Sequence, residues 1–132
     1  MLKLYCDGGS RGNPGKSACA YFVFEDEKLL TFGCKYLGIQ TNNYAEYNGL
    51  LLGLTSVIKE FKPDSLEVYL DSELVVKQIN GLYKVENEVL KTLKGKIEEK
   101  KFLIANLKII HVLREQNKFA DKLVNICLDA SM

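Results

Sequence analysis

The sequence carries almost no net charge, because 18 lysines and arginines face 17 aspartates and glutamates. A chain so close to neutral lacks the strong basic field that captures nucleic acid non-specifically, so any contact with a polyanion must be local. Arginine is scarce as well, since Arg11 and Arg114 are the only two. The other basic residues are lysines, which we expect mainly on the solvated surface.

The cysteines do not form a recognisable metal-binding or redox pattern. Cys6, Cys19, Cys34 and Cys127 contain no Cys-x-x-Cys pair and no zinc-finger spacing. The sequence also lacks a signal peptide and any apolar run long enough to cross a membrane. We therefore expect a cytoplasmic protein with buried free thiols and no membrane partner, while a disulfide such as Cys6–Cys127 stays open.

No linker, repeat or low-complexity segment interrupts the 132 residues, so we expect a monomer with one domain over residues 1–132. Alternating apolar residues predict a first strand over residues 2–7, followed by a glycine-rich loop up to Gly15. The same patterning predicts further strands over residues 18–24, 29–36, 66–71 and 106–113. Helices are expected over residues 41–60, 72–80, 86–101 and 117–128, with caps at Thr41–Asn43 and at Asn117. This order predicts an α/β fold with about five strands and helices covering the sheet.

Two aspartates, Asp7 and Asp71, each stand at the predicted end of an alternating strand. Ligands of α/β sheets bind beyond the strand ends, and a usual crossover connection makes these two strands neighbours. Each aspartate also has a structural interpretation, Asp7 as a turn residue and Asp71 as a helix cap.

Glu46 is harder to explain by structure alone. It shares a helix face with Gly49 and Gly53, which permit a close approach to the sheet, and a buried carboxylate without a partner costs several kcal/mol. Asp121 lies in the first turn of the last predicted helix, where an acid also complements the helix dipole. Carboxylates gathered together repel unless a multivalent cation holds them, and hard oxygen ligands select Mg²⁺ or Mn²⁺. The joint interpretation is a two-ion phosphodiester-hydrolysing site with Asp7, Glu46, Asp71 and Asp121 as ligands.

The glycine-rich stretch also needs comparison with nucleotide-binding loops, because Gly15-Lys16-Ser17 resembles the end of a Walker A motif. The match fails, since Ser10 stands where that motif has glycine and the residues after Ser17 are strand-like. A kinase-like phosphoryl-transfer lobe also opens with an acid and glycines after a strand. A chain of this length lacks the second lobe that such enzymes need.

Four strings, in this order along the chain, resemble the type 1 ribonuclease H family: YCDGGSRGNPG at 5–15, TNNYAE at 41–46, LDSELV at 70–75 and REQNKFAD at 114–121. The similarity spans the whole chain. It implies endonucleolytic hydrolysis of the RNA strand of RNA/DNA hybrids by a two-metal-ion mechanism with Mg²⁺ or Mn²⁺. It also implies a five-stranded mixed sheet whose second strand is antiparallel, with helices on both faces.

The resemblance implies roles for individual residues. The metal-binding acids are Asp7, Glu46, Asp71 and Asp121, and the positions matching substrate-contacting residues are Gly8, Asn13, Thr41, Asn42 and Asn43. Capping and turn formation remain structural alternatives for the polar ones. Arg114 occupies the place where many relatives have a catalytic mobile histidine, whereas the single histidine, His111, is expected to be a structural residue of the last strand.

Other departures concern the substrate. Glu73 stands where some relatives have a substrate-contacting amide, and it either weakens hybrid binding, supplies an outer contact to metal or faces solvent. The connection over residues 81–86 is too short for the basic protrusion of some relatives, so the chain resembles the compact form. Tyr83 in that connection is a candidate for the DNA-strand groove or for the core. Cleavage of double-stranded RNA stays open, and the alternative function is a module that binds such duplexes without cutting.

Overall fold

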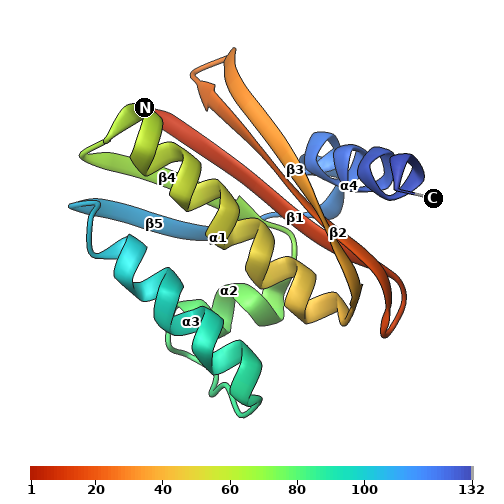
Figure 1. The fold of residues 1–132 in the computed structure, drawn as a ribbon. Coiled ribbons are helices and arrows are strands. Elements are labelled where there is room, and N and C mark those ends of the chain that lie inside the picture. The colour runs from red at the N-terminus through yellow and green to blue at the C-terminus, as the bar shows by residue number, and fades with distance from the viewer. Residues whose placement is uncertain (132) are drawn as a thin grey trace.

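The computed structural model describes residues 1–131, which form a sheet with helices on both of its faces (Figure 1). The strands are β1 (Leu2–Gly12), β2 (Gly15–Glu25), β3 (Lys28–Gln40), β4 (Ser65–Leu70) and β5 (Asn106–His111). The helices are α1 (Asn42–Phe61), α2 (Glu73–Ile79), α3 (Glu88–Lys101) and α4 (Lys118–Ala130), with a short 3₁₀ helix η1 (Arg114–Gln116) before α4.

The five strands lie in the order β3-β2-β1-β4-β5. β2 is antiparallel to both β1 and β3, whereas β4 is parallel to β1 and β5 is parallel to β4. The predicted five-stranded mixed sheet with an antiparallel second strand is therefore confirmed. The crossover through α1 makes β1 and β4 neighbours, as expected of the usual crossover connection.

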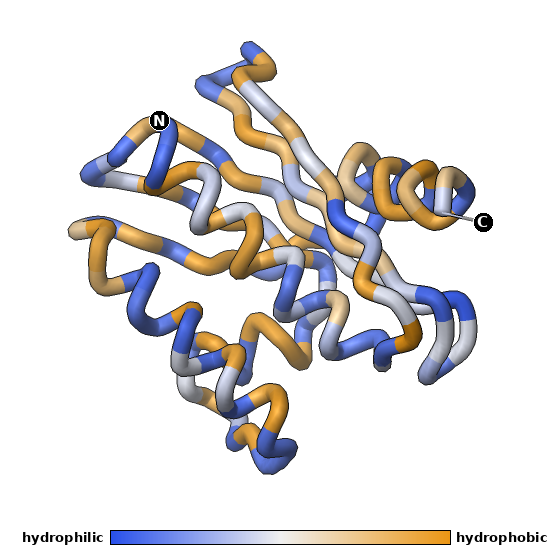
Figure 2. Tube along the Cα trace, in the orientation of Figure 1, coloured by the Kyte–Doolittle hydropathy of each residue, from blue (hydrophilic) through white to orange (hydrophobic). Residues whose placement is uncertain are grey.

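Alternation along β2 separates two hydrophobic cores. Tyr21 and Val23 join the large core with α1, whereas Ala18 and Ala20 pack with α4 in a second, smaller cluster. The helices α1, α2 and α3 accordingly lie on one side of the sheet and α4 on the other (Figure 1). Each helix carries both hydrophobic and hydrophilic positions around its axis, as expected for helices that pack one face on the sheet (Figure 2).

The predicted glycine-rich loop after Asp7 is wrong. β1 continues through the glycines to Gly12, paired with β2, and the chain reverses only at Asn13-Pro14. A glycine is needed at position 8, because a Cβ there would lie 2.1 Å from the carbonyl oxygen of Ala45 on α1. The glycines thus let α1 press against the middle of the strand, and Asp7 lies within β1.

Two predicted helix starts are confirmed by their caps. Thr41 Oγ1 accepts a hydrogen bond from the amide of Tyr44 (3.2 Å), and Ser72 Oγ accepts one from the amide of Val75 (3.3 Å). Asn117 is the N-cap residue of α4, as predicted, but its side chain makes no capping hydrogen bond, because its Nδ2 donates instead to the carbonyl of Cys6 (2.8 Å). The structural role of His111 is not supported either, since this residue is exposed at the end of β5.

All four cysteines are free thiols, and Cys34 is exposed while the others are buried. Cys6 belongs to the large core and Cys127 to the small one, so the sheet separates them and the fold does not pair them. Among residues 1–131, no helix combines the length and the apolar character needed to cross a membrane.

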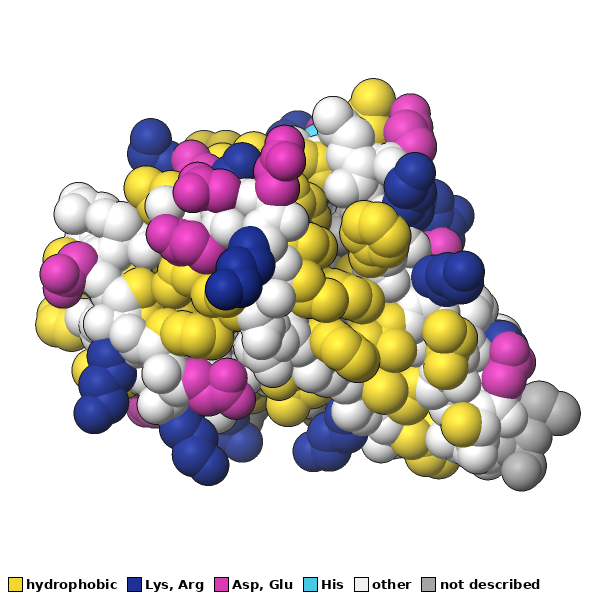
Figure 3. All heavy atoms as spheres, turned by 90° about the horizontal axis from the view of Figure 1, so that it is seen from above, with side chains coloured by type: hydrophobic (Ala, Val, Ile, Leu, Met, Phe, Trp, Pro, Cys, Tyr) yellow, Lys and Arg dark blue, Asp and Glu magenta, His cyan; other side chains and the backbone are white. Residues whose placement is uncertain are grey.

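Aromatic rings extend the α4 side of the sheet beyond the small core. Tyr5 stacks on Tyr69 with ring centroids 4.8 Å apart, and Phe119 of α4 packs against Phe22 and Phe24 at 6.0 and 6.5 Å. Hydrophobic side chains gather in one stretch on the face of the molecule seen from above, with charged groups around it (Figure 3). The first turn of α4 is therefore held to the sheet by aromatic contacts.

Candidate active site

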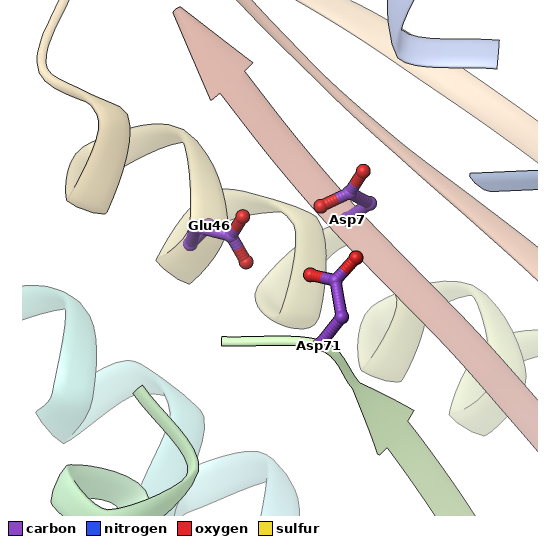
Figure 4. Close-up of side chains that lie close together, drawn as sticks. All are labelled: Asp7, Glu46 and Asp71. Carbon is purple, nitrogen blue, oxygen red and sulfur yellow. The ribbon is translucent and has the colours of Figure 1, made fainter. Parts of the chain in front are cut away.

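Three carboxylates from three different elements meet at one point of the fold. Asp7 comes from the middle of β1, Glu46 from the start of α1 and Asp71 from the residue directly after β4. One oxygen from each lies within 4.8 Å of the others, and the side chains point toward one another (Figure 4). We call these three residues the carboxylate cluster.

The carboxylate cluster is buried more deeply than isolated acids tolerate. Asp7 is 4% and Glu46 5% exposed, and Glu46 Oε2 has no hydrogen-bond partner among the described residues. An unpartnered buried carboxylate oxygen is strongly unfavourable. A hard divalent cation satisfies such oxygens, so the donor set fits Mg²⁺ or Mn²⁺.

The pKa values of the cluster reflect this crowding. Burial, reinforced by the charge of Asp71, raises the pKa of Asp7 from its usual 3.8 to about 7. Burial and then the neighbouring Asp7 raise the pKa of Glu46 well above its ordinary value. Burial also raises the pKa of Asp71, while the Arg114 charge and a hydrogen bond from Asn117 oppose that rise. The protein thus holds the carboxylates together against their mutual repulsion.

Asp121 lies at the rim of the same site. It lines, with the three clustered acids, a cavity of about 380 Å³, and its side chain is 35% exposed. Arg114 Nη2 lies 3.6 Å from Asp121 Oδ1, and the arginine side chain is 80% exposed. The structure therefore brings the four predicted metal ligands and Arg114 to one cavity, with Asp121 outside the tight cluster.

The predicted substrate residues around the hairpin mainly contact one another. Asn13 Oδ1 accepts a hydrogen bond from the amide of Asn42 (3.0 Å), and Asn42 Oδ1 accepts one from the amide of Ser10 (3.1 Å). Thr41 is the helix cap, and Asn43 follows it on α1 as a half-buried residue. These contacts join the β1–β2 hairpin to the start of α1 at the cavity, which Gly8 and Asn42 line.

Glu73 and Tyr83 lie outside the carboxylate cluster, around α2. Glu73 Oε1 pairs with Lys77 Nζ at 2.7 Å, and the same Nζ lies 3.3 Å from the hydroxyl of Tyr83. Tyr83 is 49% exposed, so its alternative interpretation as a core aromatic is wrong. Both side chains are accessible from solvent.

Two residues of the site were not singled out for it by the sequence. Asn117 is 2% exposed, tethers β1 at Cys6 through Nδ2, and leaves its Oδ1 without a partner among the described residues. Arg11 lines the cavity from the β1–β2 hairpin. Asn117 lies between Arg114 and Asp121 in the string REQNKFAD, a signal that could have pointed to it, although the sequence assigned it to helix capping.

Comparison with known proteins places this geometry in a family. A family model described as reverse transcriptase-like matches residues 5–127. A bifunctional protein of Mycobacterium tuberculosis is 35% identical over 130 residues, which cover 97% of this chain and 35% of that protein. A ribonuclease HI of Halobacterium salinarum is 36% identical over 129 residues, which cover 97% of this chain and 64% of that protein.

Solved structures agree with the sequence relatives. The RNase H1 named LC11, in complex with an RNA/DNA hybrid, superimposes with a TM-score of 0.92 and 36% identity over 99% of both chains. The RNase H1 of Halobacterium salinarum gives a TM-score of 0.92 at 33% identity over 98% of both chains. The chain spans about a third of the mycobacterial protein and 64% of the halobacterial one. By family model, sequence and fold together, the chain belongs to the reverse transcriptase-like family, as a member of the type 1 ribonucleases H.

Proposed function

We propose that this protein is a metal-dependent endoribonuclease that hydrolyses the RNA strand of RNA/DNA hybrids. The observation that carries the proposal is the buried carboxylate cluster, in which one oxygen from each of Asp7, Glu46 and Asp71 lies within 4.8 Å of the others. The similarity to an RNase H1 that binds an RNA/DNA hybrid supports the choice of substrate.

Asp7, Glu46 and Asp71 are the residues that would hold divalent ions, and Asp121 at the rim completes the set. Two ions, Mg²⁺ or Mn²⁺, balance four carboxylates better than one does. When bound, such ions activate water and neutralise charge on the scissile phosphate and the leaving oxygen.

Arg114 acts as the cationic partner of this acidic site. Its guanidinium is positively charged and presents several donors that suit phosphate oxygens. Because its side chain is 80% exposed beside Asp121, it is free to approach a phosphate of the scissile strand. Arg114 thereby stabilises the charge that develops during cleavage.

The side of the cavity next to the β1–β2 hairpin binds the RNA strand. Gly8 lines the cavity with its backbone, and Asn13, Thr41, Asn42 and Asn43 offer amide and hydroxyl groups that can bind 2′-hydroxyls and base edges. Contact with the 2′-hydroxyl is what distinguishes RNA from DNA at such a site. We assign Tyr83 to the groove for the DNA strand, where its exposed ring would supply a stacking surface. Glu73 faces solvent in an ion pair with Lys77.

The substrate is tested by incubating the protein with end-labelled RNA/DNA hybrid, double-stranded RNA, single-stranded RNA and double-stranded DNA, in Mg²⁺ and in Mn²⁺. We expect internal cuts in the RNA strand of the hybrid and intact DNA. Cuts in double-stranded RNA as well would widen the substrate class without changing the chemistry. Hybrid binding without cleavage in either metal would refute the proposal in favour of a non-cleaving binding module.

A further inference from the structure

Arg11, near the tip of the β1–β2 hairpin, contacts α4 through both of its terminal guanidinium nitrogens. Its Nη1 lies 2.8 Å from Asp129 Oδ1, and its Nη2 donates to the side-chain oxygen (3.3 Å) and the carbonyl oxygen (3.5 Å) of Asn125. Arg11 belongs to β1, whereas both partners belong to α4. One guanidinium therefore links the strand that carries Asp7 to the helix that carries Asp121.

The partners of Arg11 share one face of α4 with Asp121. Asp121, Asn125 and Asp129 follow one another at intervals of four residues, which aligns them along the helix. Asn125 Nδ2 in turn donates to the backbone carbonyl of Asp121 (3.1 Å). The contacts of Arg11 thus reach the first turn of α4, where Asp121 enters the cavity.

Contacts with Phe22 and Phe24 through Phe119 hold the first turn of α4, and Arg11 adds a polar link farther along the helix, at Asn125 and Asp129. The buried residues of α4 form only the small cluster with Ala18 and Ala20, separate from the large core. Its last turn contains Asp129 and no basic residue, although a helix C-terminus favours cations. Arg11 supplies from β1 the positive charge that the last turn of α4 lacks.

We propose that Arg11 is a positioning residue that fixes α4 against the β1–β2 hairpin and so keeps Asp121 beside the carboxylate cluster. This inference rests on the proposed function, because it assigns Asp121 to the metal site. Arg11 lines the edge of the cavity, but its guanidinium is engaged by Asp129 and Asn125, so its effect is on the placement of α4.

The arrangement calls for arginine rather than lysine. A guanidinium presents several donors in one plane, so it binds the Asp129 carboxylate and the Asn125 oxygens together. A lysine in the same place keeps the ion pair with Asp129 but cannot hold both partners in a fixed geometry. The Mn²⁺ affinity of Arg11→Lys should therefore lie between that of the parent protein and that of Arg11→Gln.

The test measures Mn²⁺ affinity from the electron paramagnetic resonance signal of the free ion, well below the unfolding temperature and without nucleic acid. We expect Arg11→Gln to weaken Mn²⁺ binding about tenfold, as loss of residues that orient metal ligands typically does. Asp121→Asn should weaken binding in the parent but add less than a twofold loss in the Arg11→Gln background. Glu25→Gln is the matched control, since it removes an exposed ion pair with the N-terminus (3.1 Å) at the other end of the β1–β2 pair.

A purely structural role predicts a different pattern. If Arg11→Gln lowers the melting temperature but leaves the Mn²⁺ affinity and the effect of Asp121→Asn unchanged, the inference is wrong. Should Arg11→Gln fail to fold, Asp129→Asn removes the same ion pair from an exposed helix position, and the same loss of affinity is expected. Parent protein that binds Mn²⁺ but leaves hybrids intact would refute the proposed function alone, because none of these readouts uses RNA.

Discussion

Asp7 and Glu46 lie with carboxylate oxygens within 4.8 Å of each other, and both side chains are almost wholly buried. Burial and neighbouring acids raise the pKa of both groups. The site is therefore a place where the protein gives up stability to keep negative charges together.

Asp7→Asn should stabilise the metal-free protein at pH 8. The pKa of Asp7 is raised from 3.8 to about 7, so the charged form is disfavoured in the folded state and stability falls as pH rises from about 4 through about 7. Removing this charge should add up to about 4 kcal/mol to the free energy of unfolding, measured by urea denaturation in EDTA. Asp64→Asn, at an exposed position away from the cluster, should change little, and a destabilised Asp7→Asn variant would contradict the account.

Metal affinity should rise with pH. A carboxylate must lose its proton before it binds a cation, and the pKa of Asp7 of about 7 places that loss near neutrality. Calorimetric titration with Mn²⁺ should show tighter binding at pH 8 than at pH 6, with release of protons into the buffer. Equal affinity at both values would show that the carboxylates are already ionised.

Arg114→Gln should lower hybrid cleavage about tenfold or more, as loss of a charge-stabilising donor does. Because the Arg114 charge lowers the pKa of Asp71, the variant should also need a higher pH to reach its maximal kcat/KM. Arg114→Lys keeps the charge and should retain the parent pH profile. If Arg114→Gln lowers kcat/KM by the same factor at every pH, the Arg114 charge does not act on cleavage through the pKa of Asp71.

Gly8→Ala should destabilise the protein by about 3 kcal/mol, since a Cβ at this position would lie 2.1 Å from the Ala45 carbonyl oxygen. Gly95→Ala on α3 is the matched control, because its Cβ would meet no described atom within 4 Å. That change should stabilise the helix by about 0.5–1 kcal/mol. Thermal unfolding of both variants measures the difference, and a neutral Gly8→Ala would show that α1 does not press on β1 there.

Much of the fold was predictable because it follows from local patterns. Alternation placed the strands, and Thr41 marked a helix start that the structure confirms. The start of α2 was also predicted, but its cap is Ser72 rather than Asp71. The extent of β1 was not predictable in this way. Glycines such as Gly8 indicate a loop in the local sequence, but here Gly8 is needed within a strand because α1 packs directly against it.

The candidate site was predictable in composition more than in geometry. Family strings pointed to the four acids, and Glu46 stood out on its own because it shares a face with glycines. The grouping into a tight cluster of Asp7, Glu46 and Asp71 with Asp121 at the rim depends on how α4 docks. Asn117 was expected to cap a helix, and its contact with Cys6, 111 residues away, has no local signature.

The central claim is that the carboxylate cluster supports hydrolysis of RNA in a hybrid. The most direct measurement compares the parent protein with Asp71→Asn on a hybrid labelled in its RNA strand, with Mg²⁺ or Mn²⁺ and with EDTA. The account predicts that the parent cuts the RNA only when metal is present and that the folded Asp71→Asn variant, verified by circular dichroism, does not. Cleavage by that variant at the parent rate, or by the parent in EDTA, would contradict it.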